Sequence, residues 1–221
     1  HKMFKYVLIL SFLTLLNCVT YNGIDVSVHQ GPNVDFNKVK KDGKSFVIMR
    51  AGIGESVDQY FESNYKKAKA AGLNVGVYWY AKALTEKQSK VEAQHCLNAI
   101  AGKQLEFPVY YDIEQKEILA KGKTFCSAIA TNFCSFMESN KKFCGIYASK
   151  YYFDTYFTDT VKNKYTIWVA QYNIKCTYTG KYSIWQRSSK GSVSGINGNV
   201  DLDVCYEDFP SIIKKAKLNG F

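Results

Sequence analysis

Short apolar runs rich in β-branched and aromatic residues recur along the whole chain, at lengths typical of buried strands. Several are almost continuously hydrophobic, as strands of a parallel sheet covered on both faces are. Between the early runs, residues 58–72, 85–102 and 124–139 carry apolar side chains at helical spacing. The eight strand-like runs are 23–28, 45–52, 74–81, 107–114, 143–149, 166–173, 182–188 and 199–206.

Strands that alternate with helices predict a parallel α/β arrangement. The end of the chain departs from it, because segments 174–181 and 189–198 are shorter than the roughly dozen residues that a parallel crossover needs. The last strands are therefore expected to be partly antiparallel. The prediction is an irregular TIM-like (β/α) barrel with its final helices missing, which forms a single domain over residues 21–221.

Residues 1–20 carry a targeting pattern, in which Lys2 and Lys5 precede the apolar run 6–16. That run is too short to span a membrane, so a secretory signal peptide is predicted rather than a retained anchor, with Met3 as its natural start. The mature chain is then expected to be secreted, or held in the lumen of a secretory or lysosome-like digestive compartment. No stable membrane insertion is expected after cleavage.

One of the 7 cysteines, Cys18, lies in the leader, and its removal leaves an even set. In a secreted chain this set predicts three disulfides of open connectivity. Cys126 and Cys134 share a predicted helix, where eight residues span about 12 Å, so these two are not expected to pair. There is no Cys-x-x-Cys pair, and neither a metal site nor a cofactor is expected. The six residues are Cys96, Cys126, Cys134, Cys144, Cys176 and Cys205.

The chain is basic, with 29 Lys and Arg against 19 Asp and Glu. The net charge of +10 becomes +8 when the two lysines of the leader are removed. A basic secreted protein is drawn to anionic polymers such as bacterial walls. The lysines are scattered rather than gathered in a groove, so we expect electrostatic steering and no binding of nucleic acid.

Two carboxylates, Asp112 and Glu114, end the fourth run and point to the same side of a strand. Because like charges resist joint ionisation, one pKa is expected to rise while the other stays low, which would supply a proton donor beside a stabilising carboxylate. Asp25 and Asp201 are expected to join them where barrel chemistry gathers, at the strand ends. The alternatives are structural carboxylates bonded to backbone or Arg50, or ligands of a divalent cation.

Aromatic side chains near the predicted strand ends are candidate platforms for sugar rings, although core packing is the plainer explanation for most of them. His29 is a candidate residue of the site wall. Nucleophilic catalysis by a Ser-His-Asp set has little support, because no Gly-x-Ser-x-Gly elbow occurs. The candidate platforms are Tyr78, Trp79, Tyr147 and Trp185.

Seven segments, taken together and in this order, resemble family 25 glycoside hydrolases, which are lysozymes that cleave peptidoglycan as N-acetylmuramidases. The resemblance covers about residues 22–209 and includes Arg50, Gln171 and Gln186, which complete the expected substrate-binding set. The segments are GIDVSVHQG (23–31), FVIMRAG (46–52), GVYWYA (76–81), PVYYDIE (108–114), IWVAQY (167–172), IWQ (184–186) and VDLDV (200–204).

The resemblance implies roles for the four acids. Glu114 matches the proton donor, Asp112 the carboxylate that orients the substrate's N-acetyl group, and Asp25 and Asp201 the further acids of the cleft. The acetamide would act as the internal nucleophile, as in substrate-assisted glycosidases. Asp203 stands where a neutral polar residue is expected, which leaves open whether Asp201 or Asp203 faces the cleft; Asp201 is favoured.

The resemblance thus implies a secreted, monomeric lysozyme domain that hydrolyses β-1,4 bonds between N-acetylmuramic acid and N-acetylglucosamine. One alternative is a chitinase-like glycosidase, which a longer acidic run before Asp112 would favour; FPVYY (107–111) stands there instead. The other alternative is a non-catalytic lectin that binds cell walls.

Overall fold

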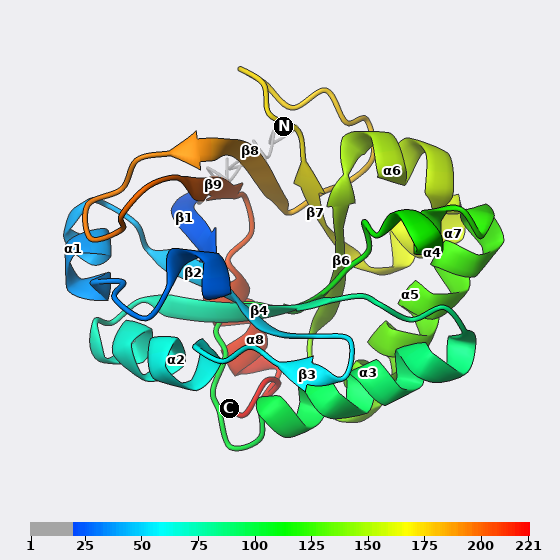
Figure 1. The fold of residues 1–221 in the computed structure, drawn as a ribbon, viewed down its shortest axis with the longest axis horizontal. Coiled ribbons are helices and arrows are strands. Elements are labelled where there is room, and N and C mark those ends of the chain that lie inside the picture. Colours follow the sequence, from blue (N-terminus) through cyan, green and yellow to red (C-terminus); the bar gives the residue numbers. More distant parts are fainter. Residues whose placement is uncertain (1–19) are drawn as a thin grey trace, which may run out of the picture.

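The computed structural model describes residues 20–221, and the predicted signal peptide lies outside them apart from Thr20 (Figure 1). Eight strands form a closed barrel in the order β1-β9-β8-β7-β6-β5-β4-β2, which pairing of β1 with β2 completes; β3 extends the edge of β2. The strands are β1 Tyr21–Val26, β2 Phe46–Ile53, β3 Ser56–Val57, β4 Asn74–Tyr80, β5 Val109–Asp112, β6 Cys144–Ser149, β7 Thr166–Ala170, β8 Ile184–Gly191 and β9 Val200–Cys205.

Helices cover the outside of the barrel beside the early strands (Figure 1). The three helices expected from apolar spacing are present as α2, α3 and α5, and α3 begins where the Thr85 hydroxyl accepts the backbone N–H of Gln88. No helix in the described part of the chain is long and apolar enough to cross a membrane. The helices are α1 Phe36–Lys41, α2 Phe61–Ala70, α3 Glu86–Ala99, α4 Lys116–Leu119, α5 Gly122–Ser139, α6 Lys150–Tyr156, α7 Asp159–Lys164 and α8 Phe209–Lys215, with a 3-10 turn η1 at Val28–Gln30.

The barrel confirms the predicted α/β class, with one difference in the closing strands. Strand β9 runs antiparallel to β1 and β8, as expected, but β7 and β8 are parallel. Strand β7 ends before its apolar run does, and β8 begins after the start of its own run. Residues 171–183 therefore connect the two strands, and they suffice for a crossover without a helix. No helix separates β7, β8 and β9 within residues 20–221.

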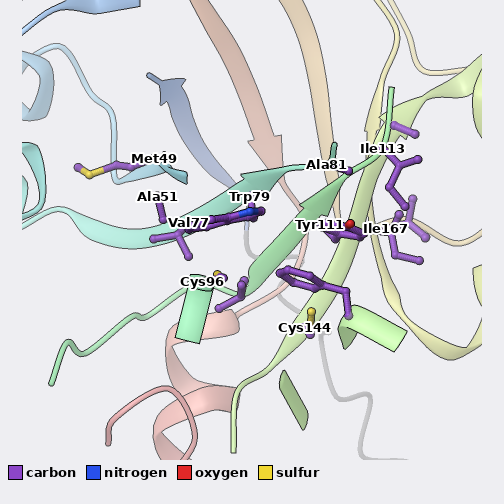
Figure 2. Close-up of a cluster of buried hydrophobic side chains, with 14 of the residues drawn as sticks. Met49, Ala51, Val77, Trp79, Ala81, Cys96, Tyr111, Ile113, Cys144 and Ile167 are labelled. Carbon is purple, nitrogen blue, oxygen red and sulfur yellow. The ribbon is translucent and has the colours of Figure 1, made fainter. Parts of the chain in front are cut away.

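Alternation along the strands divides the core into two layers. Outward side chains pack against the helices, as the Tyr111 ring stacks on Phe133 of α5. Figure 2 shows Val77, Trp79 and Tyr111 within this buried cluster. Inward side chains fill the barrel, and Phe209 of α8 packs edge-on against Phe107 and Phe143. Helix α8 thereby closes the end of the barrel where the parallel strands begin, and polar side chains are left to gather at the other end.

The inner aromatic layer depends on glycine. A Cβ at Gly145 would lie 2.4 Å from Cγ2 of Thr166 and 2.6 Å from the Tyr110 ring. A Cβ at Gly23 would lie 2.4 Å from the Phe46 ring. The narrow barrel can hold the Tyr110 and Phe46 rings because glycine leaves the position next to each ring without a side chain.

The prediction of three disulfides is not confirmed, because all six cysteines among the described residues are free thiols. Five of them are buried, and Cys205 lies inside the barrel while Cys96 lies in the outer core (Figure 2). The thiols of Cys144 and Cys134 are 3.2 Å apart, whereas Cys126 and Cys134 do not pair. Most of these cysteines therefore occupy packing positions of small apolar side chains.

Candidate active site

The four predicted carboxylates, Asp25, Asp112, Glu114 and Asp201, lie around one cavity of about 280 Å³ where the parallel strands end. Asp201 reaches it because β9 is antiparallel, so that the start of β9 stands opposite the end of β1 and Asp201 pairs with Asp25. The cavity is lined by Asp25, His29, Arg50, Tyr78, Tyr80, Asp112, Glu114, Tyr147, Trp168, Tyr172, Gln186, Ser189 and Asp201.

Asp112 and Glu114 share one face, as the alternation predicted, because the N–H of Ile113 donates to Tyr147 O and continues the ladder past β5. Burial raises the pKa of Asp112 well above its usual range, and the Glu114 charge adds to this while Arg50 opposes it. Burial also raises the pKa of Glu114, and Asp201 adds to that shift. The expected division into one raised and one low pKa is therefore absent, since burial dominates at both carboxyl groups.

A buried carboxylate fixes Arg50 at the cavity wall. Asp58 Oδ2 accepts hydrogen bonds from Arg50 Nε at 2.8 Å and from the N–H of Val28 at 3.0 Å, and Asp58 Oδ1 accepts the N–H of Tyr60 at 3.0 Å. Asp58 was not among the site residues predicted from the sequence. The ion-pair partner of Arg50 is thus Asp58 rather than one of the four cavity acids.

An amide holds Asp25 in place on β1, the strand that pairs with the Arg50 strand. Gln186 Nε2 donates to Asp25 Oδ2 at 2.7 Å, while Gln186 Oε1 accepts the hydroxyl groups of Tyr147 at 2.9 Å and Tyr172 at 3.0 Å. Two donors on Oε1 determine the orientation of the amide. Burial raises the pKa of Asp25 well above its usual range, and the charges of Asp203 and Asp201 contribute.

Asp201 and Asp203 stand two residues apart on the inner face of β9, at different depths. Asp201 lines the cavity, whereas Asp203 is only 2% exposed and lies below it. Trp168 Nε1 donates to Asp203 Oδ1 at 2.8 Å, and burial raises the pKa of Asp203 to about 7. The placement agrees with the choice of Asp201 as the acid that faces the cleft.

Two of the four predicted aromatic platforms lie elsewhere. Trp79 is fully buried in the outer core, where its Nε1 donates to Gly54 O at 2.9 Å (Figure 2). Trp185 is 8% exposed and its Nε1 donates to Gln171 O at 2.7 Å. Trp79 follows the inward Tyr78 and Trp185 precedes the inward Gln186, so strand alternation turns both indoles outward. Neither can stack on a sugar in the cavity, whereas Tyr78 and Tyr147 line it.

A second hollow of about 350 Å³ adjoins the first and shares Glu114, Tyr147 and Tyr172 with it. Its rim carries the exposed rings of Tyr151 and Tyr172, and the predicted Gln171 also lines it. Glu114 therefore stands at the junction of an acidic cavity and an aromatic one. The hollow is lined by Glu114, Tyr147, Ser149, Lys150, Tyr151, Ala170, Gln171 and Tyr172.

Several residues of this site were missed from the sequence. Tyr80 stands two residues beyond Tyr78 on β4, so strand alternation was a usable signal for it. Tyr172 lies in the loop after β7, but the predicted run 166–173 includes it, and it continues the alternation of Trp168 and Ala170. Among the described residues, no group of three or more His, Cys, Asp or Glu side chains is arranged to hold a metal ion.

A closed α/β barrel whose carboxyl groups meet at the strand ends is an arrangement of hydrolases that work with pairs of carboxylic acids. The model of glycosyl hydrolases family 25 matches residues 24–196, and the chain belongs to this family.

An autolytic lysozyme of Clostridium acetobutylicum is 32% identical over 187 residues, which cover 82% of this chain and 54% of that protein. The chain thus spans about half the length of this relative. The autolysin LytC of Streptococcus pneumoniae, solved with a synthetic peptidoglycan ligand, superposes with a TM-score of 0.78 at 25% identity over 85% of this chain and 47% of its own. The CTP1L endolysin gives a TM-score of 0.75 at 30% identity over 88% and 70%.

Proposed function

We propose that this chain is a lysozyme that hydrolyses β-1,4 bonds between N-acetylmuramic acid and N-acetylglucosamine in peptidoglycan, with Glu114 as proton donor. The observation that carries the proposal is the position of Glu114, which stands beside Asp112 at the junction of the two cavities with its pKa raised by burial. The autolytic lysozyme and the peptidoglycan-bound autolysin among its relatives support this choice of substrate.

The carboxyl groups suit substrate-assisted hydrolysis. Glu114 keeps its proton to a higher pH than an exposed glutamate and donates it to the leaving glycosidic oxygen. Asp112 Oδ1 is buried without a donor among the described residues, so it is available to accept the acetamide N–H of the substrate. The acetamide oxygen then attacks the anomeric carbon, and Glu114 takes a proton from the water that opens the intermediate.

The remaining polar side chains shape the cleft in this proposal. Asp25 and Asp201 form its acidic floor, while Arg50 and His29 stand in its wall. Tyr78 and Tyr147 offer ring surfaces for the sugar, and the net charge of +8 without the two leader lysines favours approach to an anionic wall. The mature chain acts as a monomer on bacterial peptidoglycan, after secretion or in a digestive compartment, and uses no cofactor.

The test is a digest of purified peptidoglycan with identification of the new reducing ends by mass spectrometry. The wild type should release muramic acid ends, and Glu114→Gln should lower the rate by about 10² to 10⁴, the usual contribution of a general acid. Glu117→Gln is the matched control, because Glu117 is exposed three residues further on and should keep full activity.

Other outcomes would replace the proposal. Glucosamine ends would indicate a different glycosidase specificity, and faster turnover of chitin oligomers would indicate a chitinase-like enzyme. Wall binding without new reducing ends would indicate a lectin. Undiminished activity in Glu114→Gln would refute the assignment of the proton donor.

A further inference from the structure

The proposed mechanism leaves one buried acid without a role. Asp203 is 2% exposed inside the barrel, one layer below the cavity. Its Oδ1 accepts the Trp168 indole N–H at 2.8 Å, but its Oδ2 has no donor among the described residues. A buried carboxylate oxygen without a donor is destabilising, because water no longer solvates it.

An acid on the neighbouring strand is able to satisfy this oxygen. In the antiparallel ladder of β1 and β9, Asp203 stands opposite Gly23 and diagonal to Asp25, on the same inner face. Asp203 and Asp201 both act on the pKa of Asp25, but only Asp203 has a buried oxygen without a donor among the described residues. Two neighbouring carboxylates repel each other, whereas one proton between them makes a strong charge-assisted hydrogen bond.

We propose that Asp25 and Asp203 form a buried carboxyl pair that holds one proton, carried by Asp25 and donated to Asp203 Oδ2. Asp203 is then a positioning residue for the cleft, which it reaches through Asp25. The hydrogen bond satisfies the orphaned oxygen, and the Trp168 N–H stabilises the charge that remains on Asp203. The pair itself does not depend on the proposed function; only its effect on hydrolysis does.

The surroundings of the pair favour retention of that proton. Burial and the neighbouring Asp203 and Asp201 raise the pKa of Asp25, while the hydrogen bonds from Trp168 and Asp25 counteract the effect of burial on the pKa of Asp203. Arg50 is bound to Asp58, whereas Arg187 acts on Asp203 and lowers its pKa. The titratable groups that face the pair are Asp201 and Cys205 of β9, Arg187 of β8, Tyr78 of β4, Tyr110 of β5, Tyr147 of β6 and Tyr172 of the loop after β7.

The pair has a consequence for the cleft. Gln186 links Asp25 to the hydroxyl groups of Tyr147 and Tyr172, and both tyrosines wall the two cavities beside Glu114. With Asp25 neutral, the acidic floor carries one negative charge fewer. Asp203 therefore keeps Asp25 neutral and oriented without contacting the substrate.

The test follows the aspartate carboxyl carbons by ¹³C NMR across a pH series of the labelled protein. Asp25→Asn and Asp203→Asn assign the two signals. Asp25 should remain protonated near neutral pH in the wild type. In Asp203→Asn it should titrate lower by about one pH unit or more, because the variant removes a like charge and brings in an amide donor. Asp159→Asn, on exposed α7, should leave the Asp25 signal unchanged.

Two results would overturn the pair. One is an Asp25 signal that titrates near the ordinary aspartate value, and the other is a signal that does not move in Asp203→Asn. A second variant, Trp168→Phe, tests the pair independently of whether Asp203→Asn folds. Loss of the indole donor should move the Asp203 signal to higher pH, and an unmoved signal there would also contradict the arrangement.

The positioning role has its own readout in the pH profile of kcat/KM on peptidoglycan. Because Asp25 loses its proton at lower pH in Asp203→Asn, the basic limb of the profile should move to lower pH in this variant. The limb should stay in place in Asp159→Asn. A shifted Asp25 signal with an unmoved profile would refute the positioning role. An inactive wild type would refute the proposed function, while the NMR titration would still decide the carboxyl pair.

Discussion

Asp58→Asn tests how far one buried ion pair supports both the fold and the cleft. The side chains of Arg50 and Asp58 are 12% and 1% exposed, and Asp58 accepts hydrogen bonds from Arg50 and from the backbone N–H groups of Val28 and Tyr60. Asparagine removes the charge and keeps a single acceptor oxygen. Its NH₂ group then points at an N–H that donates to Asp58 in the wild type, so two donors face each other.

The magnitude follows from burial. Breaking a buried ion pair by removing one partner costs about 3–5 kcal/mol. For a domain of this size each kcal/mol shifts Tm by about 2–4 °C, so we expect Asp58→Asn to lower Tm by roughly 6–20 °C. The activity on peptidoglycan should also fall, because Arg50 loses the contact that holds it at the cavity wall.

Thermal unfolding followed by circular dichroism measures the effect, with Asp154→Asn as the matched control. The Lys150–Asp154 pair has side chains that are 30% and 42% exposed, and an exposed pair contributes less than about 1 kcal/mol. A Tm of Asp58→Asn within about 2 °C of that of Asp154→Asn would refute the reasoning, because burial would then make no difference to the pair.

Two further predictions concern the inner face of the barrel. The pKa of Asp112 is raised in the folded state, so above about pH 4 the unfolded chain loses a proton that the native state keeps, and stability falls as pH rises until the native group also ionises. Asp112→Asn should therefore raise Tm relative to wild type at pH 7 and not near pH 3; a lower Tm at pH 7 would contradict this. Gly145→Ala should destabilise the protein by about 1–3 kcal/mol in urea unfolding, because the added Cβ meets Thr166 and Tyr110; an unchanged midpoint would show that β6 can shift.

The local pattern of the chain was sufficient for the barrel class and for the acids at its strand ends. Alternation is a property of neighbouring residues, and so the shared face of Asp112 and Glu114 follows from their spacing alone. The same rule applied to Tyr78 and Trp79 shows that only one of them can face inward. Both were predicted as platforms because they are aromatic, although strand alternation allows only Tyr78 to face the cavity while Trp79 faces the outer core.

Strand ends were less predictable than strands. The apolar runs around β7 and β8 extend beyond the paired residues, so residues 174–181 alone were expected to connect them and were too few for a parallel crossover. The observed connection is longer and covers residues 171–183. Even cysteine number likewise suggested disulfides, whereas the folded chain uses most of these thiols as small buried groups. Neither the hydrophobicity of a segment nor the number of cysteines predicts which strand pairs with which, or whether two thiols form a bond.

The sequence by itself determined the eight strands of the barrel, the three helices α2, α3 and α5, and the acids that end the strands, because these depend on periodicity and on residues close in the chain. Only the tertiary structure decided the partners of those acids, such as Gln186 for Asp25, which are 161 residues apart. It also decided the depth of Asp203 and the burial that raises the pKa of both Asp112 and Glu114. Closure of the barrel brings distant strands together and excludes water, and desolvation follows from that closure rather than from any local pattern.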